Sequence, residues 1–244
     1  MGVFVNLAQT HYFLFVQRYE IKMIEKKYYK DAFERIDDDR KNKILEIGIE
    51  EFSTKGFENA NINIIAKNAG ISIGLMYKYF STKEDLFMAC LIRGMGILEK
   101  ALYDIMISDD KLISKAEKLV KTIYSHSKRH SNYIKMYNEI CAEKSSLDRI
   151  KEIVEEIESK RSSIYIETIG RALAKGEVRP DLDPRLFAYF LDNLLTTLQF
   201  SFTCDYYREK LRVYTGVDAV EDTEDQIVKQ MLKFIESAFT FEKK

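Results

Sequence analysis

The sequence predicts an all-α protein, with a small three-helix unit near the N-terminus and a larger helical bundle after it. Apolar residues recur at helical spacing almost everywhere from residue 24 onward. The 244 residues include only 2 Pro and 10 Gly, which is too little turn chemistry for a sandwich or a barrel. Short helices with tight turns precede longer amphipathic ones, so we expect two helical parts.

Charge and cysteine usage limit the possible partners. With 38 Lys and Arg against 39 Asp and Glu, the net charge is -1, so any attraction to nucleic acid must come from a local patch. No apolar run reaches the ~18 residues of a membrane span, and we expect no membrane partner. Cys90, Cys141 and Cys204 are widely separated and offer neither a disulfide framework nor a metal site. We therefore expect a cytoplasmic protein with no cofactor.

Residues 1–40 are interpreted as an N-terminal extension. Residues 1–16 are apolar and aromatic, but they lack the basic start and the small-residue cleavage site of a signal peptide. An alternative is that translation begins at Met23, which would leave residues 1–22 as an upstream extension without a role.

The first helix of the small unit is expected between Asp39 and Phe57. Its apolar positions form a one-sided stripe, which comprises Ile44, Leu45, Gly48, Ile49 and Phe52. Asp37 to Asp39 are favourable at the N-terminus of this helix, and Gly56 provides a stop.

Two short helices follow. Asn61 is expected to cap the first of them, whose buried face comprises Ile62, Ile65, Ala66 and Ala69. Gly70 supplies the positive φ of a tight turn, and Ser72 caps the next helix, Ile73 to Tyr79. Two short helices around a glycine-containing turn are typical of a helix-turn-helix.

Longer helices make up the rest of the chain. The run from Ser81 to Glu84 is interpreted as a capping box that opens a helix ending near Met106. Polar breaks near 109–110, 127–132 and 144–148 separate the helices that follow. We expect the longest helix at about 147–175, an apolar helix from Asp183 to about Tyr207, and a last helix at about 223–241.

The helix-turn-helix segment carries the clearest functional signal. Residues 59–83 contain no Asp or Glu but three Lys, which suits a phosphate backbone. The N-terminal residues of a recognition helix reach base edges, so we expect groove contacts from Ser72, Ile73, Leu75 and Lys78. Phosphate contacts are expected from Asn61, Tyr77, Tyr79 and Lys83. Tyr77 could instead be a core residue, as Met76 and Phe80 are expected to be.

A run of residues within this segment matches a known family. It comprises Ile65-Ala66, Ala69-Gly70-Ile71-Ser72, Gly74, Tyr77, Tyr79-Phe80, Ser81, Lys83-Glu84 and Leu86-Phe87. The run resembles the DNA-binding signature of TetR-type transcriptional regulators, over about residues 41–88. The resemblance implies a helix-turn-helix DNA-binding domain at 41–88 and an effector-binding and dimerisation domain at 89–244. It also implies a homodimer on double-stranded operator DNA and a small-molecule effector.

Two sets of side chains in the second domain are candidate contacts. The apolar stripes of the last two expected helices are too rich for a solvent-facing surface. They are expected to form a four-helix dimer interface through Phe187, Leu191, Leu194, Leu198, Ile227, Met231 and Phe234. By resemblance, a mostly apolar effector is expected to contact Tyr103, Tyr124, Tyr133, Met136, Tyr137, Tyr165 and Ile169. Each of these also fits ordinary core packing.

The sequence contains no recognisable enzyme motif. It has no glycine-rich phosphate loop, nucleophile elbow or catalytic triad spacing, so no enzyme activity is expected. His126 and His130 stand four residues apart, which suits a metal ion, although a pair at a helix end favoured by the dipole explains them more simply. We expect a repressor released from its operator by a small effector. The alternative is a constitutive DNA-binding or helical interaction module without a ligand.

Overall fold

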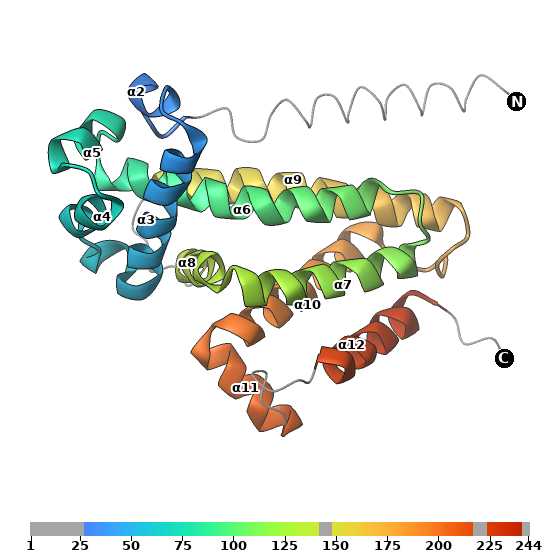
Figure 1. Cartoon of the computed structure of the whole chain (residues 1–244). Helices are drawn as coiled ribbons and strands as arrows, with labels where there is room; N and C mark the ends of the chain where they lie inside the picture. The colour runs from blue at the N-terminus through green and yellow to red at the C-terminus, as the bar shows by residue number, and fades with distance from the viewer. Residues whose placement is uncertain (1–26, 142–147, 217–223, 241–244) are drawn as a thin grey trace, which may run out of the picture.

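The computed structural model describes residues 27–141, 148–216 and 224–240, and every regular element within these ranges is a helix (Figure 1). The N-terminal helices are α2 (Asp31–Glu34), α3 (Asp38–Asn59), α4 (Ile62–Ala69), α5 (Ile73–Tyr79) and α6 (Lys83–Ile107). The others are α7 (Leu112–Arg129), α8 (Ser131–Cys141), α9 (Asp148–Ala174), α10 (Pro184–Thr203), α11 (Asp205–Thr215) and α12 (Glu224–Phe239). The predicted all-α fold is confirmed. No helix among the described residues is both long and apolar enough to cross a membrane.

Helix α6 joins the two parts of the molecule (Figure 1). It begins beside α3, and its remaining length runs along α9 in the bundle. Helices α7 and α10 pack against each other and complete the bundle with α6 and α9. The short helix α8 packs against α3, so Tyr133, Met136 and Ile140 join the core of the N-terminal unit. The two parts therefore share helices, and the division at residue 88 passes through α6.

Local hydrogen bonds at the helix ends largely follow the sequence. Asn61 accepts a bond from the Asn63 amide at 2.9 Å, Ser72 accepts one from the Leu75 amide at 3.2 Å, and Gly70 has a φ of 73°. The predicted caps of α4 and α5 are thus confirmed. The prediction for α6 is wrong by one residue, because Thr82 rather than Ser81 accepts the bond from the third helical amide, at 3.0 Å.

Residues 27–40, which the sequence analysis assigned to an extension, pack into the N-terminal unit. Tyr28 and Phe33 are buried, and the Phe33 ring lies 4.8 Å from that of Phe80. The Lys30 amide donates to the Tyr79 carbonyl at 2.8 Å. These contacts place α2 directly against α5. Met23, the alternative start, lies outside the described residues.

Replacing Gly94 with alanine should destabilise the protein. The new methyl group would lie 1.9 Å from Cδ1 of Tyr133, so α6 and α8 would have to separate. Overpacking of this kind typically costs about 1–3 kcal/mol, which a urea titration can measure as a lower free energy of unfolding.

Gly170→Ala in α9 is the matched control, because no atom would lie within 4 Å of its methyl group. This variant should gain up to about 1 kcal/mol from helix propensity. Equal changes in the two variants would contradict the close approach at Gly94.

Candidate nucleic-acid interface and effector cleft

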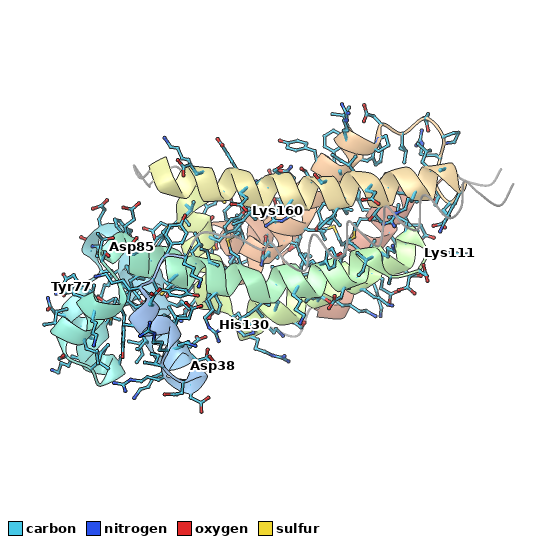
Figure 2. All side chains as sticks on the ribbon, turned by 90° about the horizontal axis from the view of Figure 1, so that it is seen from above. Asp38, Tyr77, Asp85, Lys111, His130 and Lys160 are labelled. Atoms are coloured by element: carbon cyan, nitrogen blue, oxygen red, sulfur yellow. The ribbon has the colours of Figure 1, made fainter. Side chains whose placement is uncertain are left out.

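Helices α4 and α5 present an exposed face at one end of the molecule. Asn61, Ser72, Ile73, Tyr77 and Lys78 are all exposed there, and Figure 2 shows Tyr77 at the outer edge of this end. Tyr77 has 47% of its surface exposed, so it is no core residue of the described chain. Leu75 is half-buried and packs against the core. This face carries no carboxylate from residues 59–83.

Core residues hold the recognition helix α5 in place. Met76 and Phe80 are fully buried, as expected. Tyr79 is also buried, and its ring packs edge-on against Phe33 at 5.5 Å. The expected phosphate contact of Tyr79 does not fit this position, because its ring is part of the interior and α2 covers this side of α5.

The Lys83 ammonium bonds to the protein itself rather than facing outward. Its Nζ donates to the carbonyls of Glu58 and Ala60, both at 3.0 Å, and lies 4.8 Å from the centre of the Phe57 ring. These contacts tie the start of α6 to the end of α3, where Gly56 leaves helical geometry. In this arrangement Lys83 acts as a structural clamp, and its amine already has two acceptors within the protein.

Three further lysines extend the positive face beyond the expected set. Lys30, Lys43 and Lys67 are exposed, and the Lys30 Nζ donates to the Tyr77 carbonyl at 2.8 Å. The Lys43 Nζ lies close to the Gly70 turn. Lys67 falls within the acid-free segment, so the sequence could have indicated it. Lys30 and Lys43 are brought here by the packing of α2 and α3, which local charge counting does not reveal.

A cleft with a cavity volume of about 30 Å³ lies between five helices of the bundle. It is lined by Gly94, Met95, Leu98, His126, Tyr133, Ile134, Tyr137, Arg161 and Gln199. Of the seven residues expected at an effector site, only Tyr133 and Tyr137 line it. Met136, Tyr165 and Ile169 are packed in the two cores, Tyr124 stacks edge-on against Phe202, and Tyr103 packs beside the bundle core.

The two tyrosine hydroxyls of the cleft donate to carboxylates. The Tyr133 hydroxyl bonds to Glu46 of α3 at 2.6 Å, and that of Tyr137 bonds to Glu158 of α9 at 2.5 Å. Burial, aided by the neighbouring carboxylate, raises the pKa of both tyrosines, so both hydroxyls keep their protons. The sequence analysis expected these hydroxyls to orient a ligand, whereas they already have protein partners.

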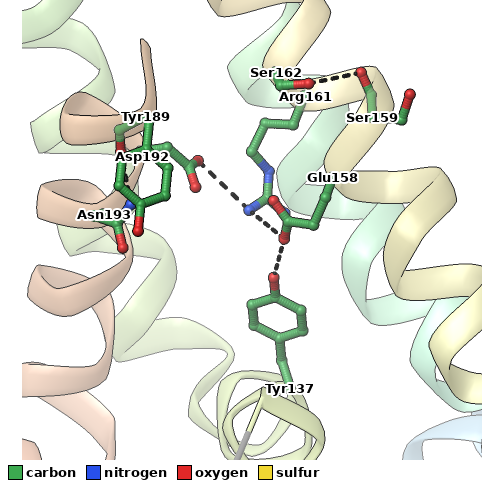
Figure 3. A network of polar contacts seen from close by, with 8 residues as sticks. All are labelled: Tyr137, Glu158, Ser159, Arg161, Ser162, Tyr189, Asp192 and Asn193. Atoms are coloured by element: carbon green, nitrogen blue, oxygen red, sulfur yellow. Dashed lines mark hydrogen bonds and ion pairs between the residues drawn. The ribbon is translucent and has the colours of Figure 1, made fainter. Parts of the chain in front are cut away.

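Arg161 is held between two carboxylates (Figure 3). Its guanidinium lies 3.4 Å from Glu158 and 3.6 Å from Asp192, and only 11% of its side chain is exposed. The network joins α8, α9 and α10, and its members Tyr137 and Arg161 line the cleft. Two negative charges face one positive charge, so Arg161 offers no uncompensated cation to the cleft.

His126 is the polar side chain of the cleft that lacks a partner. It is buried, and both of its ring nitrogens are without a hydrogen bond. Burial, with smaller contributions from His130 and Arg129, lowers the pKa of His126 to about 4, so the imidazole is neutral near pH 7. The His130 ring lies 4.7 Å away, and no group of three potential metal ligands occurs in the described part of the chain.

Replacing Lys83 should destabilise the N-terminal unit. Lys83→Met keeps most of the apolar stem but removes both bonds to carbonyls, and about 1–3 kcal/mol of unfolding free energy should be lost. Lys78→Met, on the exposed side of α5, is the control and should stay within about 0.5 kcal/mol of the original protein. Thermal or urea unfolding measures both variants, and an unchanged stability of Lys83→Met would argue against the clamp.

The chain is similar to known proteins in both sequence and fold. Residues 44–90 match the family described as bacterial regulatory proteins, tetR family. The transcriptional repressor KstR2 of Mycobacterium tuberculosis is 23% identical over 152 residues, which are 62% of this chain and 76% of that protein. A TetR family regulator from Chloroflexus aurantiacus has a TM-score of 0.65 at 16% identity, over 88% of this chain and 99% of that chain. AibR, solved with isovaleryl coenzyme A and operator DNA, has a TM-score of 0.62 at 18% identity, over 80% and 97%.

The family match and the structural likeness cover different parts of the chain. The matched residues include α4, α5 and most of α3, which form the exposed face. The likeness to the solved structures continues through the bundle. The chain therefore carries, at residues 44–90, the helix-turn-helix domain of TetR-family transcriptional regulators.

Proposed function

We propose that this regulator is a cytoplasmic repressor that binds its operator as a homodimer and releases it when a small effector fills the cleft beside Tyr133. A repressor and a regulator solved with both an effector and operator DNA are among the proteins that it resembles. The observation that carries the proposal is that one side chain, Tyr133, both lines the cleft and bonds to the DNA-binding unit.

The exposed face of α4 and α5 is proposed as the DNA contact. Ser72, Ile73, Leu75 and Lys78 lie in or directly before α5, and they would face the major groove, because the N-terminal part of a recognition helix reaches base edges. An apolar Ile73 suits contact with a thymine methyl group. Tyr77 and the surrounding lysines Lys30, Lys43 and Lys67 would contact phosphates, together with the exposed cap residue Asn61.

An apolar surface on α10 and α12 is proposed as the dimer interface. Leu186, Tyr189, Phe190 and Phe234 each expose more than half of their surface, and the rings of Phe187 and Phe239 connect the two helices at 5.2 Å. Phe187, Leu194, Ile227 and Met231 are half-buried along this surface. Leu191 and Leu198 are buried within the single chain, so they would support the interface from behind. A second copy of the chain would cover the exposed rings.

Phe234→Asp should convert the dimer to a folded monomer, because it places a charge on the exposed surface and not in the core. Operator binding should weaken, because two recognition helices must be held about 34 Å apart. Ile97→Asp, on the exposed side of α6, is the control and should remain a dimer. Light scattering and circular dichroism distinguish the outcomes. A Phe234→Asp dimer, or an unmutated monomer at micromolar concentration, would contradict this interface.

Movement of Tyr133 would connect the cleft with the DNA-binding face. Its ring packs on α6 at Gly94, and its hydroxyl holds Glu46, which also lies 3.8 Å from Arg93 of α6. A ligand that displaces the ring would disturb α3 and α6 together. An effector can release DNA only through its different affinity for the two conformations, and a nearly complete shift needs about 5.5 kcal/mol.

Tyr133→Phe tests this connection, because it keeps the ring and removes the bond to Glu46. An apolar compound that binds the cleft in a thermal-shift screen should lower the operator affinity of the original protein at least tenfold. The quantity to compare is the operator affinity without the compound divided by that with it. In Tyr133→Phe this ratio should be about fivefold smaller, because the lost hydrogen bond contributes about 1 kcal/mol.

Tyr137→Phe is the matched control, because its hydroxyl bonds within the bundle. It should keep the original ratio in a DNA-binding titration. Equal effects of the two substitutions would refute the route through Glu46. Compounds that fill the cleft without changing operator affinity would favour the alternative, a constitutive DNA-binding module.

A further inference from the structure

We infer that the cleft selects a small neutral molecule whose hydroxyl or carbonyl oxygen bonds to His126 and Gln199 and whose apolar body lies against α6 and α8. The inference names the ligand class of the cleft on which the proposed function rests. It goes beyond the apolar effector expected from the sequence, because it assigns a polar contact and a charge preference.

His126 has hydrogen-bonding groups that no atom of the described residues satisfies. Its two ring nitrogens are buried without a partner, and a buried unsatisfied polar group destabilises the folded chain. Gln199 is also buried and belongs to α10 on the same cleft, and its side-chain amide can donate to a ligand oxygen. An oxygen that bonds to both residues would satisfy one of the two His126 nitrogens and so remove part of this destabilisation.

The charged groups around the cleft favour a neutral ligand. The neutral His126 imidazole has one N–H donor and one acceptor, and the Arg161 cation is already compensated by Glu158 and Asp192. A carboxylate ligand would therefore bring a third negative charge beside this network without a free cation to receive it. A neutral alcohol or ketone avoids that repulsion and still uses both neutral side chains.

The side of the cleft formed by α6 and α8 has an apolar lining. Met95, Leu98 and Ile134 provide apolar surface, and Gly94 lines the cleft with backbone alone. The cavity volume of about 30 Å³ is room for about two water molecules. The body of a ligand must therefore displace part of the lining, as the proposed movement of Tyr133 would allow.

Four compounds of nearly equal size separate the contributions: acetophenone, 1-phenylethanol, ethylbenzene and benzoate. Calorimetric titration of the full chain near pH 7.5 should give affinities for acetophenone and 1-phenylethanol at least tenfold higher than for the other two. Tighter binding of benzoate would overturn the charge argument. Failure of all four to bind at millimolar concentration would overturn the ligand class.

His126→Leu should abolish the preference, so that ethylbenzene binds at least as well as acetophenone. His130→Gln, four residues away and outside the cleft lining, is the control and should keep the original order. Without ligand, His126→Leu should also unfold at a higher temperature, because it replaces an unsatisfied polar group with an apolar one. An unchanged preference in His126→Leu would refute the role of His126.

This test is independent of DNA binding. If His126 discriminates among the compounds but none of them changes operator affinity, the ligand class stands and effector control of DNA binding fails. If operator affinity responds but His126→Leu keeps the same order of affinities, the proposed function stands and the inference about His126 fails.

Discussion

The close packing of Tyr133 against Gly94, together with its bond to Glu46, is the constraint on which the arrangement of the two parts depends. A methyl group at Gly94 would lie 1.9 Å from the Tyr133 ring, so the present approach of α6 and α8 requires a residue without a side chain at this position. This approach places α8 against α3 and brings Tyr133, Met136 and Ile140 into the core of the N-terminal unit. The DNA-binding unit is therefore completed by a helix of the bundle. A rearrangement of α8 would change the support of α3, against which α4 packs.

Features that depend on residues within four positions of each other could be predicted from the sequence. The caps at Asn61 and Ser72 and the turn at Gly70 are of this kind, because cap and backbone partner are close in the chain. The error at α6 has the same origin. Ser81 and Thr82 are adjacent hydroxyl residues, and the sequence allows either to cap the helix. Each is followed three residues later by an acidic residue, Glu84 or Asp85.

Features that depend on distant partners could not be predicted. Lys83 was recognised as a cation, but its carbonyl partners at Glu58 and Ala60 are more than twenty residues away. The side of Tyr79 that faces α2 was unknown, because the four-residue helix α2 has no periodic pattern to detect. On α10, helical periodicity identified an apolar helix without separating its buried side at Leu191 from its exposed side at Phe190. The spacing of residues along one helix does not show which neighbour covers each side.

Arg161 and His126, which both line the cleft, differ in how their burial is compensated. Arg161 has two carboxylate partners, and the ion pairs hold α9 and α10 together beside Tyr137. His126 is buried to a similar degree without any partner, so the folded chain carries the cost of an unsatisfied imidazole. A cost of this kind persists where a group serves binding rather than stability. From the sequence alone, His126 could be placed only near the end of a helix. Its position near the C-terminus of α7 is visible in the sequence, whereas its lack of a partner depends on α6, α8 and α10, which enclose it together.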